Sequence, residues 1–366
     1  MGRWAEVKRW RGVLWGICAV LLTQGISYLA ARVPVVVERL YSRLLYPPLG
    51  RFLSRITALA PFSLAEVAVV GLLVAALLGI LHWIFVGWRR PAVWLRQVRG
   101  ILAIALFAYA AFILLWGLNY YRQPLAVTLQ LEVQPTAVAE LADLCAELIA
   151  RTNAARQLVA EDGQQVMMLN GGKWRALSRA ELGYEELAKQ LPLASGRFGA
   201  PKGVYLSHWW SYTGTAGMYS PFTGEANVNM AMPDLNIPVV ACHEMAHQRG
   251  FAREDEANYL AYLACTHHPD LEFQYSGLMM ALSQAMQALR RSDPDTFAAL
   301  RAEYAPGIIR DLRANQAYWQ AFTGPVEQLS ERMNDAYLKS NRQADGVQSY
   351  GRMVDLLLAE RRAGNE

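Results

Sequence analysis

The sequence predicts a mainly α-helical membrane protein. An N-terminal three-helix transmembrane region precedes an α+β domain with a small sheet and a helical C-terminal part. Hydrophobic residues make up 54% of the 366 residues and charged residues only 18%, a balance that leans towards membrane proteins. The apolar runs long enough to cross a bilayer all lie in residues 1–122, whereas from Pro135 onward apolar residues recur at helical spacing in a more polar chain. We therefore assign residues 1–122 to the transmembrane region and 123–366 to a second domain.

Three apolar runs are expected to span the bilayer, and they cover residues 13–31, 63–86 and 101–118. A cleaved signal peptide is the alternative for the first run, but the run is long for one and no cleavage site follows it. The second run begins with Ser63-Leu64-Ala65-Glu66, which has the form of a capping box. We therefore interpret Glu66 as a helix cap rather than as a functional carboxylate within the membrane.

Aromatic and basic residues border the spans. Aromatic belts are expected at Trp83 and Trp88 after the second span and at Trp116, Tyr120 and Tyr121 after the third. Residues 32–62 are amphipathic and are predicted to form two short helices on the membrane surface, separated at Pro47-Pro48.

The distribution of basic residues predicts the orientation. The N-terminus and the loop after the second span together carry eight Lys and Arg residues, against five in the loop after the first span. The side with more basic residues is expected to be cytoplasmic, which places residues 123–366 outside the cytoplasm. The net charge is only +4 and the basic residues flank apolar runs, so the pattern indicates a lipid bilayer as partner and no nucleic acid.

The second domain is predicted to combine helices with a few strands. The expected elements are a helix around residues 138–149, a loop or hairpin at 160–176, a helix at 182–191, strands near 204–206 and 224–230, a shaped loop at 208–214, and helices from Pro238 to the end, with breaks at Gly324-Pro325 and Asp345-Gly346. The four cysteines form no Cys-x-x-Cys pair and are expected to be buried free thiols. A disulfide among Cys145, Cys242 and Cys265 is the alternative.

The sequence His243-Glu244-Met245-Ala246-His247 lies in an apolar run and predicts a metal site. Residues four apart share a helix face, so His243 and His247 can direct their imidazoles at one point, as half of a tetrahedral zinc site. Glu244 is placed to act as a general base rather than as a ligand. Gly250 is expected to end the helix and turn the chain back.

An acidic helix start follows at once and supplies the third ligand in this interpretation. Glu254 is the expected zinc ligand, and Asn258, one turn later, is expected to orient an imidazole. Glu256 and Asp255 remain competitors for the ligand position. His267 and His268 follow the second helix and are expected to cap its end. The alternative to a zinc site is that the two histidines are ordinary core residues and that the acidic turn after them is solvated.

The chain resembles an uncharacterised bacterial family of three-span membrane proteins that carry a zincin-like domain of unknown function. The resemblance covers nearly the whole chain and rests on these blocks: 61–66, 221–229, 243–262, 334–339 and 345–351. It implies a multi-pass protein of the bacterial cell membrane. The metal block is also similar to gluzincin peptidases, in which a Glu-x-x-Ala-Asp sequence supplies the third ligand. Here that ligand would be Glu254, with Asn258 where aspartate is usual and a shorter gap after His247.

The function expected from these features is a membrane-anchored zinc metallopeptidase acting on a peptide or protein, with Glu244 as general base. Tyr350 and then His208 are the candidates for stabilising the oxyanion, and each has the alternative of a packed or capping aromatic. The strand at residues 226–229 is expected to pair with an extended substrate. The alternatives are a non-catalytic, zinc-stabilised membrane sensor or scaffold, and a zinc hydrolase of lipid or cell-wall amides.

Overall fold

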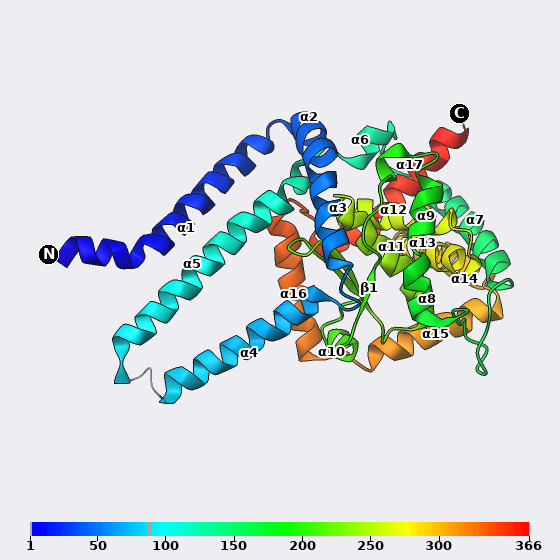
Figure 1. Ribbon diagram of the computed structural model, residues 1–366. Helices are drawn as coiled ribbons and strands as arrows, with labels where there is room; N and C mark the ends of the chain where they lie inside the picture. Colours follow the sequence, from blue (N-terminus) through cyan, green and yellow to red (C-terminus); the bar gives the residue numbers. More distant parts are fainter. Residues whose placement is uncertain (1, 86–88, 366) are drawn as a thin grey trace.

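The computed structural model describes residues 2–85 and 89–365 and is mainly helical, with 72% of its residues in helices. Three long helices project from a body that contains the remaining elements (Figure 1). A three-stranded sheet lies within that body. The mainly helical fold class, the three apolar N-terminal helices and the small sheet predicted from the sequence are thereby confirmed.

The projecting helices are α1 (Gly2–Ala30), α4 (Leu64–Phe85) and α5 (Pro91–Leu115). Each contains a segment long and apolar enough to cross a membrane. The third helix starts ten residues before the predicted span at 101–118 and ends at Leu115. The predicted span end at Val86 and the interface residue Trp88 lie outside the described residues. Helices α1 and α5 run side by side in the same direction (Figure 1), in contact at small residues such as Gly12 and Ala103.

Residues 34–57 form one uninterrupted helical stretch, so the predicted break at Pro47-Pro48 is wrong. The stretch consists of α2 (Pro34–Val36), the π-helix η1 (Val37–Leu45) and α3 (Tyr46–Thr57). The two prolines fall in the first turn of α3, directly after the wider π-helical turns. Inside a helix a proline removes one backbone hydrogen bond and its ring crowds the carbonyl of the preceding turn, and the wider π-helical turns before Pro47 and Pro48 give the chain room for them.

One face of this stretch is buried against the body of the protein. The buried positions follow one another at intervals of about one turn: Glu38, Ser42, Tyr46, Gly50, Ser54 and Thr57. Gly50 packs against the backbone carbonyl of Gln248, and the Ser54 hydroxyl accepts a hydrogen bond from the Gly199 N–H at 3.1 Å. The stretch is therefore part of the wall of the second domain as well as a neighbour of the long helices.

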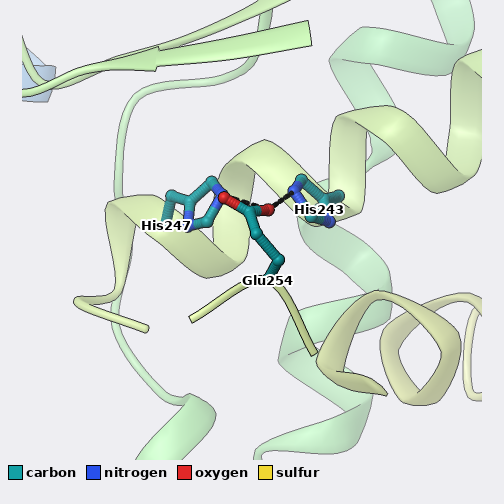
Figure 2. Close-up of side chains that lie close together, drawn as sticks. All are labelled: His243, His247 and Glu254. Atoms are coloured by element: carbon teal, nitrogen blue, oxygen red, sulfur yellow. Dashed lines mark ion pairs between the residues drawn. The ribbon is translucent and has the colours of Figure 1, made fainter. Parts of the chain in front are cut away.

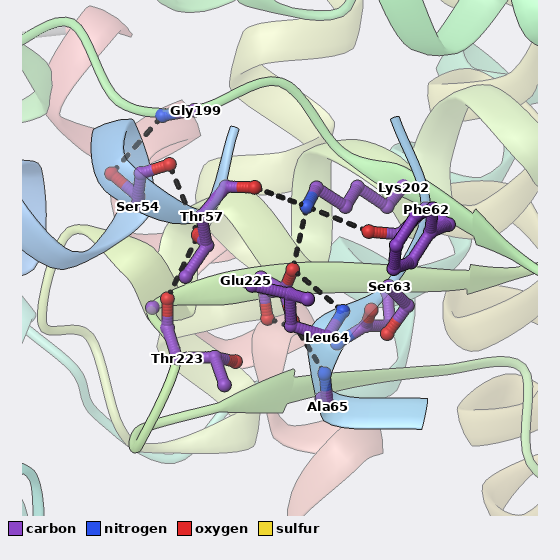
Figure 3. Close-up of polar contacts among 12 residues, drawn as sticks. Ser54, Thr57, Phe62, Ser63, Leu64, Ala65, Gly199, Lys202, Thr223 and Glu225 are labelled. Atoms are coloured by element: carbon purple, nitrogen blue, oxygen red, sulfur yellow. Dashed lines mark hydrogen bonds and ion pairs between the residues drawn. The ribbon is translucent and has the colours of Figure 1, made fainter. Parts of the chain in front are cut away.

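The start of α4 is held by the sheet (Figure 3). The Glu225 carboxylate accepts hydrogen bonds from the Leu64 and Ala65 N–H groups at 3.0 and 2.7 Å, and Lys202 Nζ pairs with it at 2.6 Å. Ser63 Oγ accepts from the Glu66 N–H as a cap, but the Glu66 carboxylate binds the N–H groups of residues 205 and 206 instead of closing a capping box. A strand residue thus completes the helix start, where free N–H groups favour an anion.

The sheet has the order β1-β3-β2, with β1 (Lys202–Val204) parallel to β3 (Glu225–Asn229) and β2 (Gly217–Ser220) antiparallel to it. The strand predicted at 224–230 is confirmed as β3, and β1 lies two residues before the strand predicted at 204–206. Strand β2 was not predicted. The loop expected at 208–214 is instead mostly helix α10 (Ser207–Tyr212). Helical spacing brings the rings of His208 and Tyr212 into contact, and Tyr212 also packs against Phe322.

The remaining helices surround the sheet and build the main core. The loop or hairpin expected at 160–176 contains one bridge, between Glu161 and Met167, and a helix begins within it at Gly172. The helix predicted at 182–191 ends early, at Leu187. The elements are η3 (Gly117–Tyr121), α6 (Leu125–Leu129), α7 (Val138–Arg156), α8 (Gly172–Arg179), α9 (Glu181–Leu187), η4 (Pro192–Ala194), η5 (Asp234–Asn236), α11 (Ile237–Gln248), α12 (Glu254–Thr266), α13 (Leu271–Ser292), α14 (Pro294–Arg301), α15 (Pro306–Gln320), α16 (Pro325–Ser340), η6 (Gly346–Arg352) and α17 (Met353–Asn365).

The core is centred on α11, α12 and α13, whose apolar residues are almost all fully buried. The four cysteines are free, as predicted, and Cys145, Cys242 and Cys265 are buried. Cys18 is exposed on α1, contrary to the expectation of burial, because α1 packs against α5 on one side and leaves its other side uncovered.

Candidate metal centre

Helix α11 carries His243, Glu244 and His247 through the middle of the domain. Its first turn contains Pro238, and ten of its twelve residues are buried, which is why the segment is apolar on every side. After Gln248 the chain turns at Gly250, whose φ of +87° lies in the left-handed region, as predicted for this glycine. A side chain at Gly250 would also collide with the ring of Tyr46. The turn sends the chain back towards the histidines and into α12.

Three side chains converge on one point between these helices (Figure 2). Glu254 Oε2 lies 3.2 Å from His243 Nε2 and 3.5 Å from His247 Nε2. The ligand atoms of the three residues all lie within 4.8 Å of one another. Two ligands on a tetrahedral zinc ion with bonds of about 2.0–2.1 Å would be about 3.3 Å apart. The two distances to Glu254 Oε2 are close to this value, so the three side chains could hold a metal ion.

The other nitrogen of each imidazole is fixed by an acceptor. His243 Nδ1 lies 2.8 Å from Asn258 Oδ1, and His247 Nδ1 lies 2.7 Å from the Phe251 carbonyl oxygen. Such acceptors place the proton on Nδ1 and leave the Nε2 lone pair for a metal. Asn258 is held in turn, since its amide donates to the Tyr350 carbonyl at 2.9 Å. The structure thus puts Asn258 beside the ligand, in the position expected for it.

The electrostatics of the site favour a bound cation. Burial opposes ionisation of Glu254, but the neighbouring His247 and hydrogen bonds from both imidazoles outweigh it and lower the pKa of Glu254 to about 2. Burial likewise opposes a charge on His247, but the Glu254 carboxylate raises the pKa of His247 to about 9. Without a metal, the Glu254 carboxylate is thus paired with a protonated His247, and a divalent cation would replace that proton as its counter-charge.

Glu244 lies in the same place but outside the ligand group. Its side chain is buried against β2, where any side chain at Gly217 would collide with the Glu244 carboxylate. Burial raises the pKa of Glu244, while the two imidazoles and a backbone hydrogen bond from Tyr219 pull it down by less. A carboxyl with a raised pKa is suited to accept a proton and pass it on.

The structure brings Tyr350 into the site and leaves His208 outside it. The Tyr350 ring stacks on His243 with centroids 6.3 Å apart, and burial, together with the nearby Glu254 carboxylate, raises the pKa of its hydroxyl. His208 is exposed on α10, and its ring packs against Tyr212 and Phe322. Of the two candidates for stabilising an oxyanion, only Tyr350 is placed beside the ligands.

The competing residues have other contacts. Glu256 accepts a hydrogen bond from the Leu125 N–H at 2.7 Å and pairs with Arg253, so its carboxylate points away from the histidines. His267 Nδ1 binds the Leu263 carbonyl at 2.8 Å, which confirms the predicted cap at the end of α12. His268 bonds to the Arg179 carbonyl instead.

Aromatic residues from other elements form the wall behind His247, and the sequence did not identify them as part of the site. The Trp116 ring meets the His247 ring edge-on, with centroids 5.8 Å apart, and its centroid lies 4.8 Å from that of the Tyr219 ring. The Tyr46 and Tyr219 hydroxyls share a hydrogen bond of 2.9 Å. The prediction that Trp116 and Tyr120 belong to a belt at the membrane interface is therefore wrong, because both are buried here. The sequence shows that Trp116 and Tyr120 follow an apolar run, but it does not show that they pack inside the second domain.

A buried ion pair links this wall to the turn after α11. Arg122 forms two hydrogen bonds of 2.8 Å with the Glu38 carboxylate and a third, also 2.8 Å, with the Gly250 carbonyl. The guanidinium also lies 4.2 Å from the centroid of the Phe251 ring. Arg122 therefore anchors the segment whose Phe251 carbonyl orients His247.

The fold and the site define a mainly helical protein with three helices that could span a membrane and a buried group of two histidines and a glutamate suited to a metal. The family model described as "Protein of unknown function (DUF3810)" matches residues 41–358, and the chain belongs to this family. The resemblance to a family of unknown function is thereby confirmed. No curated protein and no solved structure matches the chain.

Proposed function

We propose that this protein is a membrane-anchored zinc metallopeptidase with a zincin-like domain of the gluzincin type. The observation that supports the proposal best is the convergence of His243 Nε2, His247 Nε2 and Glu254 Oε2, with Glu244 alongside. When bound there, zinc supplies a Lewis acid that polarises the scissile carbonyl and makes water a better nucleophile at neutral pH.

The chain's own residues supply the proton transfers. Glu244 takes a proton from the attacking water and gives it to the leaving amine, a role that its buried carboxyl and raised pKa favour. The Tyr350 hydroxyl donates a hydrogen bond to the oxyanion that develops on the substrate carbonyl. Asn258 and the Phe251 carbonyl keep the two imidazoles in the tautomer that leaves Nε2 free.

Strand β2 is the place where an extended substrate would pair. The prediction that the strand at 226–229 pairs with substrate is corrected, because β3 is the central strand and already has a partner on each side. Strand β2 is an edge strand and packs on α11, directly over Glu244. A peptide added to this edge by β-augmentation would pass close to the metal ligands.

The membrane location and orientation belong to the same proposal. The three candidate spans anchor the protein in a bacterial cell membrane, with the N-terminus in the cytoplasm and the metal domain outside it, as the excess of basic residues predicts. A peptide or protein in that compartment is the proposed substrate.

The test compares the full-length wild type with Glu244→Gln in detergent, and Glu303→Gln on the exposed surface serves as the control. Metal analysis is expected to find about one zinc per chain in all three proteins. Hydrolysis of casein should fall by about 10²- to 10⁴-fold in Glu244→Gln only. Absence of near-stoichiometric zinc from the wild type would refute the metal assignment. Zinc in the wild type without any hydrolysis would favour the alternative of a zinc-stabilised sensor or scaffold.

A further inference from the structure

Helix α16 (Pro325–Ser340) buries Leu338 but exposes three other apolar residues in one row. Val326, Leu329 and Met333 are 56%, 59% and 66% exposed, and their spacing of three and four residues puts them in one stripe. The residues turned towards the protein are mostly polar, since Glu327 and Asn334 are half-buried. A helix on the surface of a water-soluble domain has the opposite arrangement, with the apolar stripe inward.

The stripe lies beside the end of a candidate span. Helix α16 runs across the side of the body from which α1, α4 and α5 project (Figure 1). Tyr337, one turn beyond Met333, packs edge-on against Phe112 of α5 with ring centroids 6.3 Å apart. Its hydroxyl shares a hydrogen bond of 3.0 Å with that of Tyr120, just after α5. The stripe therefore continues from a surface that is itself suited to lipid, the apolar segment Ala92–Leu115.

The outer face of α3 (Tyr46–Thr57) has the same character on the same side of the body (Figure 1). Phe52 and Ile56 are exposed there and share a shallow hollow with Arg51 and Arg55. Apolar residues with arginines between them are typical of helices that lie in the headgroup region of a bilayer.

We propose that the α16 stripe, Val326, Leu329 and Met333, is a lipid-contact surface and that α16 lies in the bilayer interface. Glu331, about 160° round the helix from Met333, and Arg332, about 100° from it, are exposed and stay in water when the stripe enters the acyl boundary. The bilayer is the partner of the stripe because the stripe is continuous with the end of α5. Helix α16 thereby joins the membrane to the metal centre, since Asn334 lies beside the Tyr350 hydroxyl.

The test places an environment-sensitive probe on α16 in the full-length protein. A Cys18→Ser parent removes the exposed thiol, and the three remaining cysteines are buried. Single cysteines are introduced as Leu329→Cys and Met333→Cys, with Glu331→Cys and Arg332→Cys as matched controls on the same helix. Each protein is labelled with a nitrobenzoxadiazole probe and reconstituted in phosphatidylcholine–phosphatidylglycerol vesicles with or without doxyl-labelled lipid.

The probes at positions 329 and 333 are expected to show blue-shifted emission and to lose most of it to the doxyl lipid. The probes at 331 and 332 should keep their emission and be quenched by iodide in the water. Equal quenching by iodide at all four positions, with no loss to doxyl lipid at 329 and 333, would overturn the proposal. Each variant is used only if its elution volume and helical circular dichroism match those of the parent, so that a folding defect is not mistaken for exposure.

Discussion

The hydrogen bond between Asn258 and His243 offers a direct test of the metal centre, through the variant Asn258→Ala. The alanine leaves the Nδ1–H of the half-buried His243 without its acceptor at 2.8 Å and the Tyr350 carbonyl without its donor at 2.9 Å. Leaving a buried polar group unpaired costs about 1–3 kcal/mol. Removing the partner of a metal-bound histidine lowers metal affinity by about 10- to 100-fold, or about 1.4–2.7 kcal/mol. The two ranges of free energy overlap, so we expect Asn258→Ala to weaken zinc binding by about 10- to 100-fold.

Zinc affinity is measured by competition with a chromophoric chelator on the full-length protein in detergent. Asn341→Ala is the matched control, because the amide of Asn341 is exposed to solvent and bonds to Tyr337 and Ser340 at the end of its own helix. Asn258→Asp keeps an acceptor for His243 and loses the donor to Tyr350, so it should bind zinc at least as tightly as the wild type. An Asn258→Ala protein that is folded and binds zinc with wild-type affinity would refute the proposed role of Asn258.

Three further outcomes are expected. Because the pKa of metal-free His247 is raised to about 9, the residue keeps its proton at neutral pH, and zinc must displace it. Apparent zinc affinity should therefore rise by about tenfold per pH unit from about pH 7 to 9 and then level off, as titration calorimetry in buffers of different ionisation enthalpy would show. Burial alone would raise the pKa of Glu38, but the Arg122 guanidinium outweighs burial and lowers this pKa below the ordinary value for glutamate. The Glu38–Arg122 pair therefore stabilises the fold above the ordinary pKa of glutamate, and this stability is lost as the pH falls through the lowered pKa. Glu38→Gln should flatten this acid limb of the thermal unfolding temperature, and an unchanged limb would contradict the assignment. Glu225→Leu should cost about 3–5 kcal/mol in urea unfolding, because it leaves the buried Lys202 ammonium without its carboxylate and the Leu64 and Ala65 N–H groups without their acceptor. Adding Lys202→Met should restore only the part of the loss that is due to the charge, and no restoration would contradict a contribution from the ion pair.

Much of the metal centre could be predicted from local spacing. Residues four apart on one helix and a glycine three residues later are enough to place His243, His247 and the turn at Gly250. The start of α12 placed Glu254 and Asn258 on the face that meets them, because residues four apart on a helix point the same way. These are short-range relations, so the sequence carries them directly.

The wall of the site could not be predicted, because it depends on contacts between distant segments. Ser42, Tyr46, Gly50 and Ser54 repeat every four residues, and as a sequence they look like the polar side of a helix on the membrane surface. Their burial comes from packing against residues far along the chain, near positions 119, 199, 219 and 248. Strand β2 was missed for the same reason, since Gly217–Ser220 is short and its identity as a strand comes from pairing with β3.

The packing of residues 34–57 has a consequence for the biogenesis of the protein. Tyr46 and Ser54 are synthesised early, yet their hydrogen-bond partners leave the ribosome 145 to 201 residues later. The wall behind His247 is complete only when the late segments have folded onto helices that precede them in synthesis. A fragment that begins at residue 123 would lack Glu38, Tyr46 and Trp116 and would expose the apolar face that they cover. The second domain therefore folds against the N-terminal third of the chain, and the candidate site can be completed only after these first helices are in place.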